Sequence, residues 1–302
     1  MIRREYHPIR RPETGGGPAP IAHASNASGR AIGVDIGATL AKIASRSDGG
    51  APSFELVPSG ELDRVAAAIA RLRPTRIGLT GGGAAELSRL LSWDTARVNE
   101  FAAWGAGAAA LLRGNGGAPA DRYLLVSLGT GTSIMQVDGM AVTRVGGTAL
   151  GGGTIMGLGA CLANEPRFEA LCELAARGAR GCVDLLVSDI YRAGEIPLAG
   201  DLTASSFGKL ARRSAGDPAP RPEDLAQAVM GLVAENVALI CSGLAAATQV
   251  RKIVFGGSTL RSNGALASVL VDITRLLGRD PLLLQGGEFA GSLGALLLAA
   301  DR

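Results

Sequence analysis

The feature that most constrains this chain is a strand–turn–strand pattern that occurs twice. Residues 31–45 read AIGVDIGATLAKIAS, an apolar run that breaks at Gly37-Ala38-Thr39 and then resumes. Residues 123–137 read YLLVSLGTGTSIMQV, and this run breaks at Gly129-Thr130-Gly131-Thr132-Ser133 before it resumes. Glycines at a turn let the backbone come close to a ligand because they lack a Cβ atom. Both patterns therefore predict a β-hairpin with a polar, glycine-containing turn.

Each hairpin is followed by helices that alternate with strands, which predicts an α/β fold of two similar lobes around a cleft. We expect a flexible extension at residues 1–30, an N-terminal lobe at 31–120 and a C-terminal lobe at 121–302. The extension is rich in Gly, Pro and Ser and has no apolar period. Helices are expected at 61–72, 84–91, 99–114, over much of 154–191 and 223–249, at 263–278 and at 288–301, and further strands at 76–80, 252–258 and 281–285.

The residue types exclude several classes of catalytic site. Both histidines, His7 and His23, lie in the predicted extension. The folded region therefore has no Ser-His-Asp triad, no Cys–His pair and no histidine metal ligand. The four cysteines form no CxxC pair, which is typical of reduced thiols in a cytosolic protein. The Walker A pattern GxxxxGK[ST] is absent, which argues against a P-loop enzyme.

Charge and hydropathy predict a soluble, cytoplasmic protein that binds neither nucleic acid nor a membrane. Residues 1–30 hold five arginines and two glutamates, whereas the rest of the chain holds 25 basic and 25 acidic residues. A nucleic-acid binder usually carries a basic excess on its folded part. The longest apolar helix, 225–249, is interrupted by Gln227, Glu235 and Asn236, and the N-terminus has no hydrophobic signal core.

The glycine turns have the composition of a phosphate-binding site. Backbone N–H groups clustered at a turn form a concavity for anions, and Thr hydroxyls add hydrogen-bond donors. Two such hairpins, one from each lobe, would hold a polyphosphate from both sides. Asp35 precedes the first turn and is a candidate partner of Mg²⁺, directly or through water. Lys42 follows the turn and supplies a point charge for phosphate. On local sequence alone, each hairpin can also be an ordinary turn.

Six segments occur in the order seen in type II pantothenate kinases: IGVDIGATLAKIA, VNEFAAWGAG, LLVSLGTGTSIMQVDGMAVTRVGGTALGGGTIMGLG, GDLTASSFG, IVFGGSTLRSN and GEFAGSLGALLL. Over about residues 31–300 the chain resembles this family, the eukaryotic-like branch of the acetate and sugar kinase/Hsc70/actin superfamily. The resemblance implies an actin-like ATPase (ribonuclease H-like) architecture. It also implies that MgATP phosphorylates pantothenate to 4'-phosphopantothenate, the first step of coenzyme A synthesis.

The resemblance further implies roles for individual residues. Glu100, which precedes Phe101, matches the catalytic glutamate of the family and is expected to act as the base. Ser133 and Arg144 match positions that contact pantothenate, and Thr130 matches one that lies near both substrates. The other candidates are expected to bind the nucleotide: Asp35, Ile36, Gly37, Ala38, Thr39, Leu40, Ala41, Lys42, Gly152, Gly153, Thr154, Ile155, Met156, Phe168 and Ser258. The family often reads Gly-Gly-Thr in the first turn, where this chain has Ala38 as the second residue.

Several alternatives stay open. From local sequence, Glu100 is also an ordinary helix-start glutamate, Arg144 a surface arginine and Phe168 a core residue. Two superfamily branches, the activators of ring-reducing dehydratases and the zinc-containing sugar kinases, are disfavoured because their cysteine motifs are absent. Kinases similar to those of N-acetylglucosamine share the hairpins but lack the 144–159 pattern.

Two hypotheses come from other classes of protein. One is a non-catalytic nucleotide or acyl-CoA sensor on the same fold, and the other is a scaffold that acts through its dimer surface. For the kinase itself, the resemblance implies a homodimer, and helices such as 225–249 are the expected contact. An acyl-CoA regulator is a further expected partner.

Overall fold

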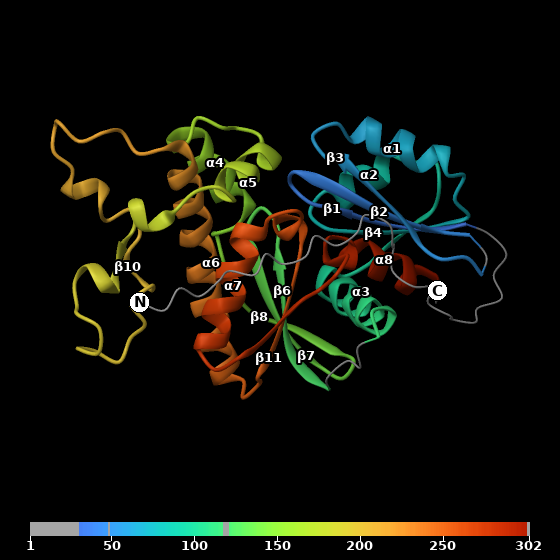
Figure 1. The fold of residues 1–302 in the computed structure, drawn as a ribbon. Helices are drawn as coiled ribbons and strands as arrows, with labels where there is room; N and C mark the ends of the chain where they lie inside the picture. The colour runs from blue at the N-terminus through green and yellow to red at the C-terminus, as the bar shows by residue number, and fades with distance from the viewer. Residues whose placement is uncertain (1–29, 48, 117–120, 301–302) are drawn as a thin grey trace.

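The computed structural model describes residues 30–47, 49–116 and 121–300, and these residues form two five-stranded sheets (Figure 1). The first sheet has the order β3–β2–β1–β4–β5, with bounds Ser53–Pro58, Leu40–Arg46, Ala31–Ile36, Arg76–Thr80 and Thr95–Arg97. The second has the order β8–β7–β6–β11–β12, with bounds Ala141–Thr148, Thr132–Asp138, Arg122–Leu128, Lys252–Gly256 and Asp280–Leu283. The predicted extension lies outside the described residues, apart from Arg30.

The two sheets have the same topology. In the first sheet, β1 pairs antiparallel with β2 and parallel with β4, while β3 and β5 form the edges. In the second sheet, β6 pairs antiparallel with β7 and parallel with β11, while β8 and β12 form the edges. The predicted α/β fold of two similar lobes is therefore confirmed, and the duplication extends from the hairpins through all five strands.

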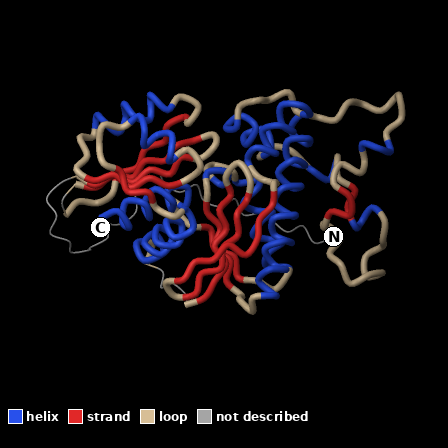
Figure 2. Tube along the Cα trace, turned by 180° about the vertical axis from the view of Figure 1, so that it is seen from behind, coloured by secondary structure: helices blue, strands red, loops and turns tan. Residues whose placement is uncertain are grey.

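Helices and sheets alternate in layers across the molecule (Figures 1 and 2). The outer face of the first sheet packs against α1 (Leu62–Arg71) and α2 (Ala84–Leu90). The outer face of the second sheet packs against α4 (Gly152–Leu162), α5 (Phe168–Ala175), α6 (Pro222–Ala247) and α7 (Gly264–Leu276). Between the sheets lie α3 (Glu100–Gly114) and α8 (Ala290–Ala300), which share a core with β6, β7 and β11. This inner layer joins the two lobes.

Alternation along β1 decides what the two faces of the first sheet contact. Ile32, Val34 and Ile36 belong to the outer core, as expected because successive strand residues point to opposite faces. Gly33 points the other way, and a Cβ atom there would overlap the carbonyl oxygen of Ser292 in α8. Glycine is needed at this position because the backbone of α8 lies directly on the strand.

The inner helices α3 and α8 approach each other as closely as α8 approaches β1. A Cβ atom on Gly107 of α3 would overlap the carbonyl oxygen of Ala290, and one on Gly294 of α8 would overlap that of Ala103. The last helix of the chain thus packs against the first sheet and against α3. The division into 31–120 and 121–302 did not anticipate this, because it assigned α8 by its position in the sequence to the second lobe.

Three parts of the chain differ from the sequence prediction, and one of them is the short edge strand β5, which was not predicted. The edge strand β3 was not predicted, because only one of its six residues, Val57, is buried and its apolar signal is weak. The predicted helical stretch 154–191 ends as helix at Ala175 and continues as 3₁₀ turns and a small sheet of β9 (Leu185–Leu186) and β10 (Thr203–Ser205). An ion pair of 2.7 Å between Arg180 and Glu235 ties this excursion to α6.

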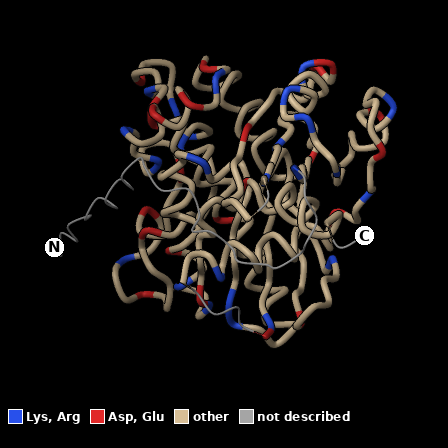
Figure 3. Tube along the Cα trace, turned by 90° about the vertical axis from the view of Figure 1, so that its right-hand side faces the viewer, with Lys and Arg blue, Asp and Glu red and all other residues tan. Residues whose placement is uncertain are grey.

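The longest helix, α6, is long and apolar enough to cross a membrane if length and composition alone are considered. Its most apolar 18-residue window has a mean hydropathy of 1.8, and 67% of that window is buried inside the fold. The apolar residues of α6 belong to the core under the second sheet. Figure 3 shows basic and acidic residues interspersed along the described chain. Both observations fit a core helix in a globular protein.

We predict that Gly294→Ala destabilises the protein by about 2 kcal/mol, because overpacking a tight contact displaces backbone or side chains. The measurement is the free energy of unfolding in urea. The matched control is Gly157→Ala in α4, where a Cβ atom meets nothing within 4 Å. That change should leave stability unchanged or raise it, since Ala favours helix over Gly. Equal effects of the two substitutions would contradict the close contact between α3 and α8.

Candidate active site

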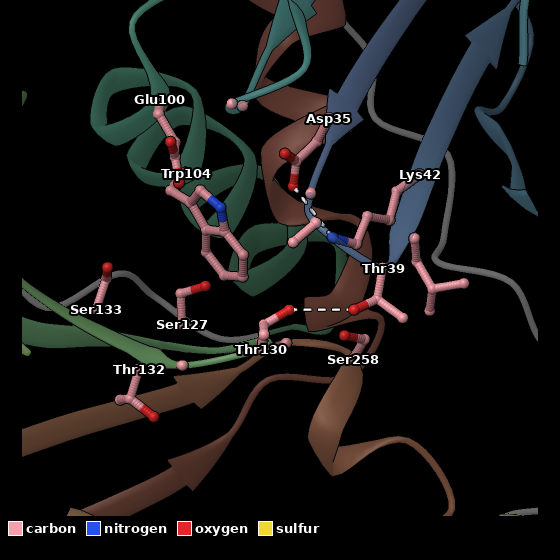
Figure 4. A pocket seen from close by; sticks show the side chains of 18 of the residues that line it. Asp35, Thr39, Lys42, Glu100, Trp104, Ser127, Thr130, Thr132, Ser133 and Ser258 are labelled. Atoms are coloured by element: carbon pink, nitrogen blue, oxygen red, sulfur yellow. Dashed lines mark hydrogen bonds and ion pairs between the residues drawn. The ribbon is translucent and has the colours of Figure 1, made fainter. Parts of the chain in front are cut away.

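A cleft of about 410 Å³ opens where the two hairpin turns meet between the lobes. Its wall contains Asp35 and Thr39 from the first lobe, Thr130 from the second, and Glu100 at the start of α3 (Figure 4). Arg144 of the second lobe also lines it. The hydroxyl oxygens of Thr39 and Thr130 lie 3.2 Å apart, within hydrogen-bonding distance. Residues 91 positions apart in the chain are thus brought into contact across the cleft.

The first hairpin places a carboxylate opposite an ammonium group. Asp35 and Lys42 are direct cross-strand partners on β1 and β2, and their side-chain atoms Oδ2 and Nζ lie 3.7 Å apart. Asp35 is buried, so the loss of hydration raises its pKa, while the charge of Lys42 acts in the opposite direction. Gly37 leaves room for the ammonium, since a Cβ atom there would lie 3.0 Å from Nζ.

Two glycines from other elements enclose the carboxylate of Asp35. A Cβ atom on Gly81, in the turn after β4, would lie 2.7 Å from Oδ1. A Cβ atom on Gly291, in α8, would lie 2.6 Å from Oδ2. Gly81 also has a φ of +86°, which favours glycine. These glycines therefore hold Asp35 in a single slot, a function that the sequence analysis did not assign to them.

Glu100 is the first residue of α3, and its neighbours fix where the helix begins. The side chain of Asn99 accepts hydrogen bonds from the backbone N–H groups of Phe101 and Ala102 at 3.0 and 3.1 Å, which is an N-cap. Burial raises the pKa of the Glu100 carboxyl, the nearby charge of Asp35 raises it further, and Lys42 lowers it. A carboxyl with a raised pKa that faces a cavity is suited to accept a proton.

The second hairpin supplies hydroxyl groups and a cation. Ser127 on β6 and Ser133 on β7 are cross-strand partners, and both line the cleft. The hydroxyl of Thr132 points away and donates to the carbonyl of Leu150 at 2.7 Å. Arg144 on β8 lines the cleft from the same sheet, and within the described residues it has no carboxylate partner. The wall therefore offers neutral donors and one uncompensated guanidinium.

Comparison with known proteins identifies the family. A family model described as Fumble matches residues 118–298. The type II pantothenate kinase of Staphylococcus haemolyticus (strain JCSC1435) is 35% identical over 267 residues, which are 88% of this chain and 99% of that protein. The chain belongs to the type II pantothenate kinase family.

Solved structures of lower sequence identity show the fold. Component A of the (R)-2-hydroxyglutaryl-CoA dehydratase of Acidaminococcus fermentans has a TM-score of 0.61 at 18% identity, and covers 90% of this chain and 98% of its own. A ROK family glucokinase of Streptomyces griseus, solved with glucose and AMPPNP, has a TM-score of 0.58 at 17% identity and covers 91% and 100%. The actin-like two-lobed architecture expected from the resemblance is therefore shown.

The structure brings most of the predicted site residues of this pantothenate kinase family member together. The predicted residues that line the cleft are Asp35, Ile36, Gly37, Ala38, Thr39, Leu40, Lys42, Glu100, Thr130, Ser133, Arg144 and Ser258. The predicted residues outside its wall are Ala41, Gly152, Gly153, Thr154, Ile155, Met156 and Phe168. Among these, Ala41 and Ile155 are fully buried core residues, and Phe168 packs against the core of the second lobe.

Gly152 and Gly153 lie behind the second hairpin rather than in the cleft. Their N–H groups donate to the carbonyl oxygens of Gly129 and Thr130 at 2.8 and 2.9 Å, so these two amides already have partners. The start of α4 thereby supports the turn that carries Thr130. Direct contact of the segment from Gly152 to Met156 with a nucleotide stays a prediction.

Sequence reasoning missed five residues of the cleft wall: Gly81, Gly82, Trp104, Thr148 and Glu288. For Trp104 a signal existed, since residues four apart on a helix share a face and Glu100 is on α3. Gly81 gave no such signal, because it reaches the cleft through the parallel pairing of β1 with β4, which places the ends of both strands side by side. That pairing cannot be read from one sequence.

We predict that Lys42→Met destabilises the protein by about 3 kcal/mol at pH 8, because it leaves the carboxylate of Asp35 buried without a partner. A raised folded-state pKa means that the folded protein binds the proton more tightly than the unfolded chain. The carboxyl of Asp35 therefore costs stability as the pH rises above its unfolded pKa, and the effect of Lys42→Met should shrink at low pH. Urea unfolding at several pH values measures this.

Two further variants serve as controls. Adding Asp35→Asn to Lys42→Met removes the buried charge and should restore most of the stability. Arg64 forms an exposed ion pair with Glu61 at 3.3 Å, and Arg64→Met should change stability little at any pH. A Lys42→Met variant with the same loss at all pH values would show that Asp35 is not the group involved.

Proposed function

We propose that this chain transfers the γ-phosphoryl group of ATP to the primary hydroxyl group of pantothenate, which forms 4'-phosphopantothenate in the first step of coenzyme A biosynthesis. The observation that carries the proposal is that Glu100 faces the same cleft as both hairpin turns. Membership in the type II pantothenate kinase family and the name of the Staphylococcus haemolyticus relative support pantothenate as the acceptor.

The hairpin turns are proposed to hold the phosphates of ATP. Turn glycines at 37, 129 and 131 line the cleft, and the hydroxyls of Thr39 and Thr130 face each other across the gap. Phosphoryl transfer depends mainly on positioning and on neutralising charge that spreads over the phosphate oxygens. Lys42 supplies a positive charge beside the first turn. ATP is also in keeping with the AMPPNP in the glucokinase of the same fold.

Magnesium is proposed to arrive with the nucleotide. Within the described part of the chain, no group of three or more Asp, Glu, His or Cys side chains could hold a metal ion. Mg²⁺ typically binds through one or two carboxylates together with substrate phosphates and water, and the slot of Asp35 fits that donor set. When bound, the ion would neutralise phosphate charge, with Asp35 holding it through water.

The acceptor is proposed to bind between Glu100 and the second sheet. Arg144 would pair with the carboxylate of pantothenate, since a guanidinium fork matches a carboxylate in shape and charge. The hydroxyl of Ser133 would bind the acceptor chain, and Trp104 would cover its apolar part. In this proposed arrangement the primary hydroxyl of pantothenate would lie beside Glu100.

The transfer then follows from these positions. Glu100 accepts the proton of the acceptor hydroxyl, whose oxygen forms a bond to the γ-phosphorus. The bond between that phosphorus and the β,γ-bridging oxygen breaks, and ADP leaves with the negative charge. Holding both substrates in one cleft increases the rate, because their alignment removes the entropy cost of their encounter. A homodimer, an acyl-CoA regulator and a cytoplasmic location stay predictions for this enzyme.

The proposal is tested by a coupled assay of ADP release with pantothenate, pantetheine, N-acetylglucosamine or no acceptor. We predict activity with pantothenate, and a fall in kcat of about 100-fold or more in Glu100→Gln, since general-base catalysis contributes on that scale. Activity with the sugar alone would overturn the assignment. Tight acyl-CoA binding without ADP release would favour the sensor hypothesis.

The pH profile in the same assay identifies the base. Glu100 must be ionised to accept a proton, and its pKa is raised by burial and by Asp35. The activity of the wild type should therefore fall with decreasing pH through a pKa above the ordinary value of a glutamate. In Glu100→Gln this acidic limb should disappear, and its persistence would point to another group.

We predict that Arg144→Met raises KM for pantothenate by about tenfold or more and leaves KM for ATP unchanged, because a charged hydrogen bond to the carboxylate is lost. Steady-state kinetics with each substrate varied in turn measures this. The control is Arg46→Met, at the end of β2 in the first lobe and outside the cleft wall, which should change neither constant. A rise in KM for ATP instead would place Arg144 on the nucleotide side.

A further inference from the structure

The duplication of the lobes reaches individual residues at the starts of the two inner helices. Glu100-Phe101-Ala102 begins α3 after β5, and Glu288-Phe289-Ala290 leads into α8 after β12. The two sheets share one topology, so α3 and α8 are equivalent elements and Glu288 is the counterpart of Glu100. Both glutamates line the same cleft. The function proposed above uses Glu100 and leaves Glu288 without a role.

The neighbours of Glu288 fix its place in the cleft wall. Gly287 packs against the end of β11, since a Cβ atom on Gly287 would lie 2.8 Å from the Cα of Gly256. Phe289 stacks on Phe54 of β3, with ring centroids 4.7 Å apart. Glu288 is therefore held beside the turn of Gly257 and Ser258, which also lines the cleft.

Glu288 differs from the other two carboxylates of the cleft in its surroundings. Asp35 is paired with Lys42. The charges that shift the pKa of Glu100 are those of Asp35 and Lys42, which places Glu100 near the first hairpin. Glu288 is half-buried, and among the residues that the structure describes it has no ion-pair or side-chain hydrogen-bond partner. Both of its oxygens are thus available to a ligand.

We propose that Glu288 accepts hydrogen bonds from the hydroxyl groups of the nucleotide sugar and makes the enzyme prefer ribonucleotides. This inference rests on the proposed kinase function and on the expectation, from the family resemblance, that Ser258 binds the nucleotide. Two neighbouring hydroxyls of a ribose present two donors, and an ionised carboxylate presents two acceptor oxygens. Hydrogen bonds to a charged group are stronger than neutral ones.

Other ligand groups fit this position less well. Phosphate oxygens carry negative charge and would be repelled by a carboxylate, and they have better partners in the hairpin turns and Lys42. The metal ion that arrives with the nucleotide is already assigned to Asp35, and Glu288 belongs to no group of three or more Asp, Glu, His or Cys side chains that could hold a metal ion within the described residues. The two equivalent glutamates then act on two kinds of hydroxyl: Glu100 on the one that reacts and Glu288 on those that position the nucleotide.

The test is calorimetric binding of ATP, 2'-deoxyATP and 3'-deoxyATP without acceptor to the wild type, Glu288→Ala and Glu288→Gln. We expect the wild type to bind ATP about tenfold more tightly than either deoxynucleotide. Glu288→Ala should bind ATP about tenfold more weakly and lose little further affinity for the deoxynucleotides, as in a double-mutant cycle. The near-isosteric Glu288→Gln should bind ATP with an affinity between those of the wild type and Glu288→Ala. Glu86→Gln, on the exposed side of α2, is the matched control and should match the wild type.

Each other outcome overturns the proposal. Equal affinity of the wild type for ATP and both deoxynucleotides would show that the protein does not recognise the sugar hydroxyls. An equal loss of affinity for all three nucleotides in both variants would indicate an electrostatic or metal-related role. A change in KM for pantothenate with KM for ATP unchanged would place Glu288 on the acceptor side. Because binding is measured without acceptor, the result stands whether or not pantothenate is phosphorylated.

Discussion

The contact of α8 with α3 and with the first sheet determines how the lobes meet. Glycines at 33, 78, 107 and 294 remove the Cβ atoms that would hold these backbones apart. Because interiors pack densely and tolerate little added volume, the spacing of this inner layer is fixed to within a methyl group. The cleft lies at one end of that layer, so its width depends on the same contacts. Asp35 shows the link directly: it lies two residues after Gly33, on the same face of β1, and its carboxylate is enclosed by Gly291 of α8.

The cleft combines one ion pair with several charged groups that have no ion-pair partner among the described residues. Asp35 and Lys42 compensate each other in the buried part of the first hairpin. Arg144 and Glu288 line the wall without an ion-pair partner there, and Glu100 keeps a raised pKa. Charged groups that line a cleft without partners are typical of sites that bind a charged or hydroxylated ligand. The arrangement suits two substrates, one with phosphates and one with a carboxylate.

Local patterns in the sequence predicted the parts of this site that local geometry builds. Both hairpins were predicted from apolar runs interrupted by Gly and Thr. The helix at 99–114 was also predicted, and in the structure it begins after an N-cap at Asn99, a position that amide side chains favour. The edge strand β3 was missed because it is mostly exposed, and the excursion after Ala175 was missed because its structure depends on partners such as Glu235, 55 residues from Arg180. The segment from Gly152 to Met156 was placed at the nucleotide by family resemblance, whereas two of its amides bond to the second hairpin.

The sequence alone determined the two polar hairpins, the alternation of strands and helices, and the lack of histidines after residue 30, since each depends on residue type and spacing along a short stretch of chain. Tertiary structure decided the rest. It showed that Thr39 and Thr130 touch, that α8 returns to the first lobe, and that Gly81 and Gly291 enclose Asp35. It also placed Glu288 in the same cleft as its counterpart Glu100. These features join residues from distant parts of the chain, and their distances are set by packing of whole elements, which no local pattern encodes.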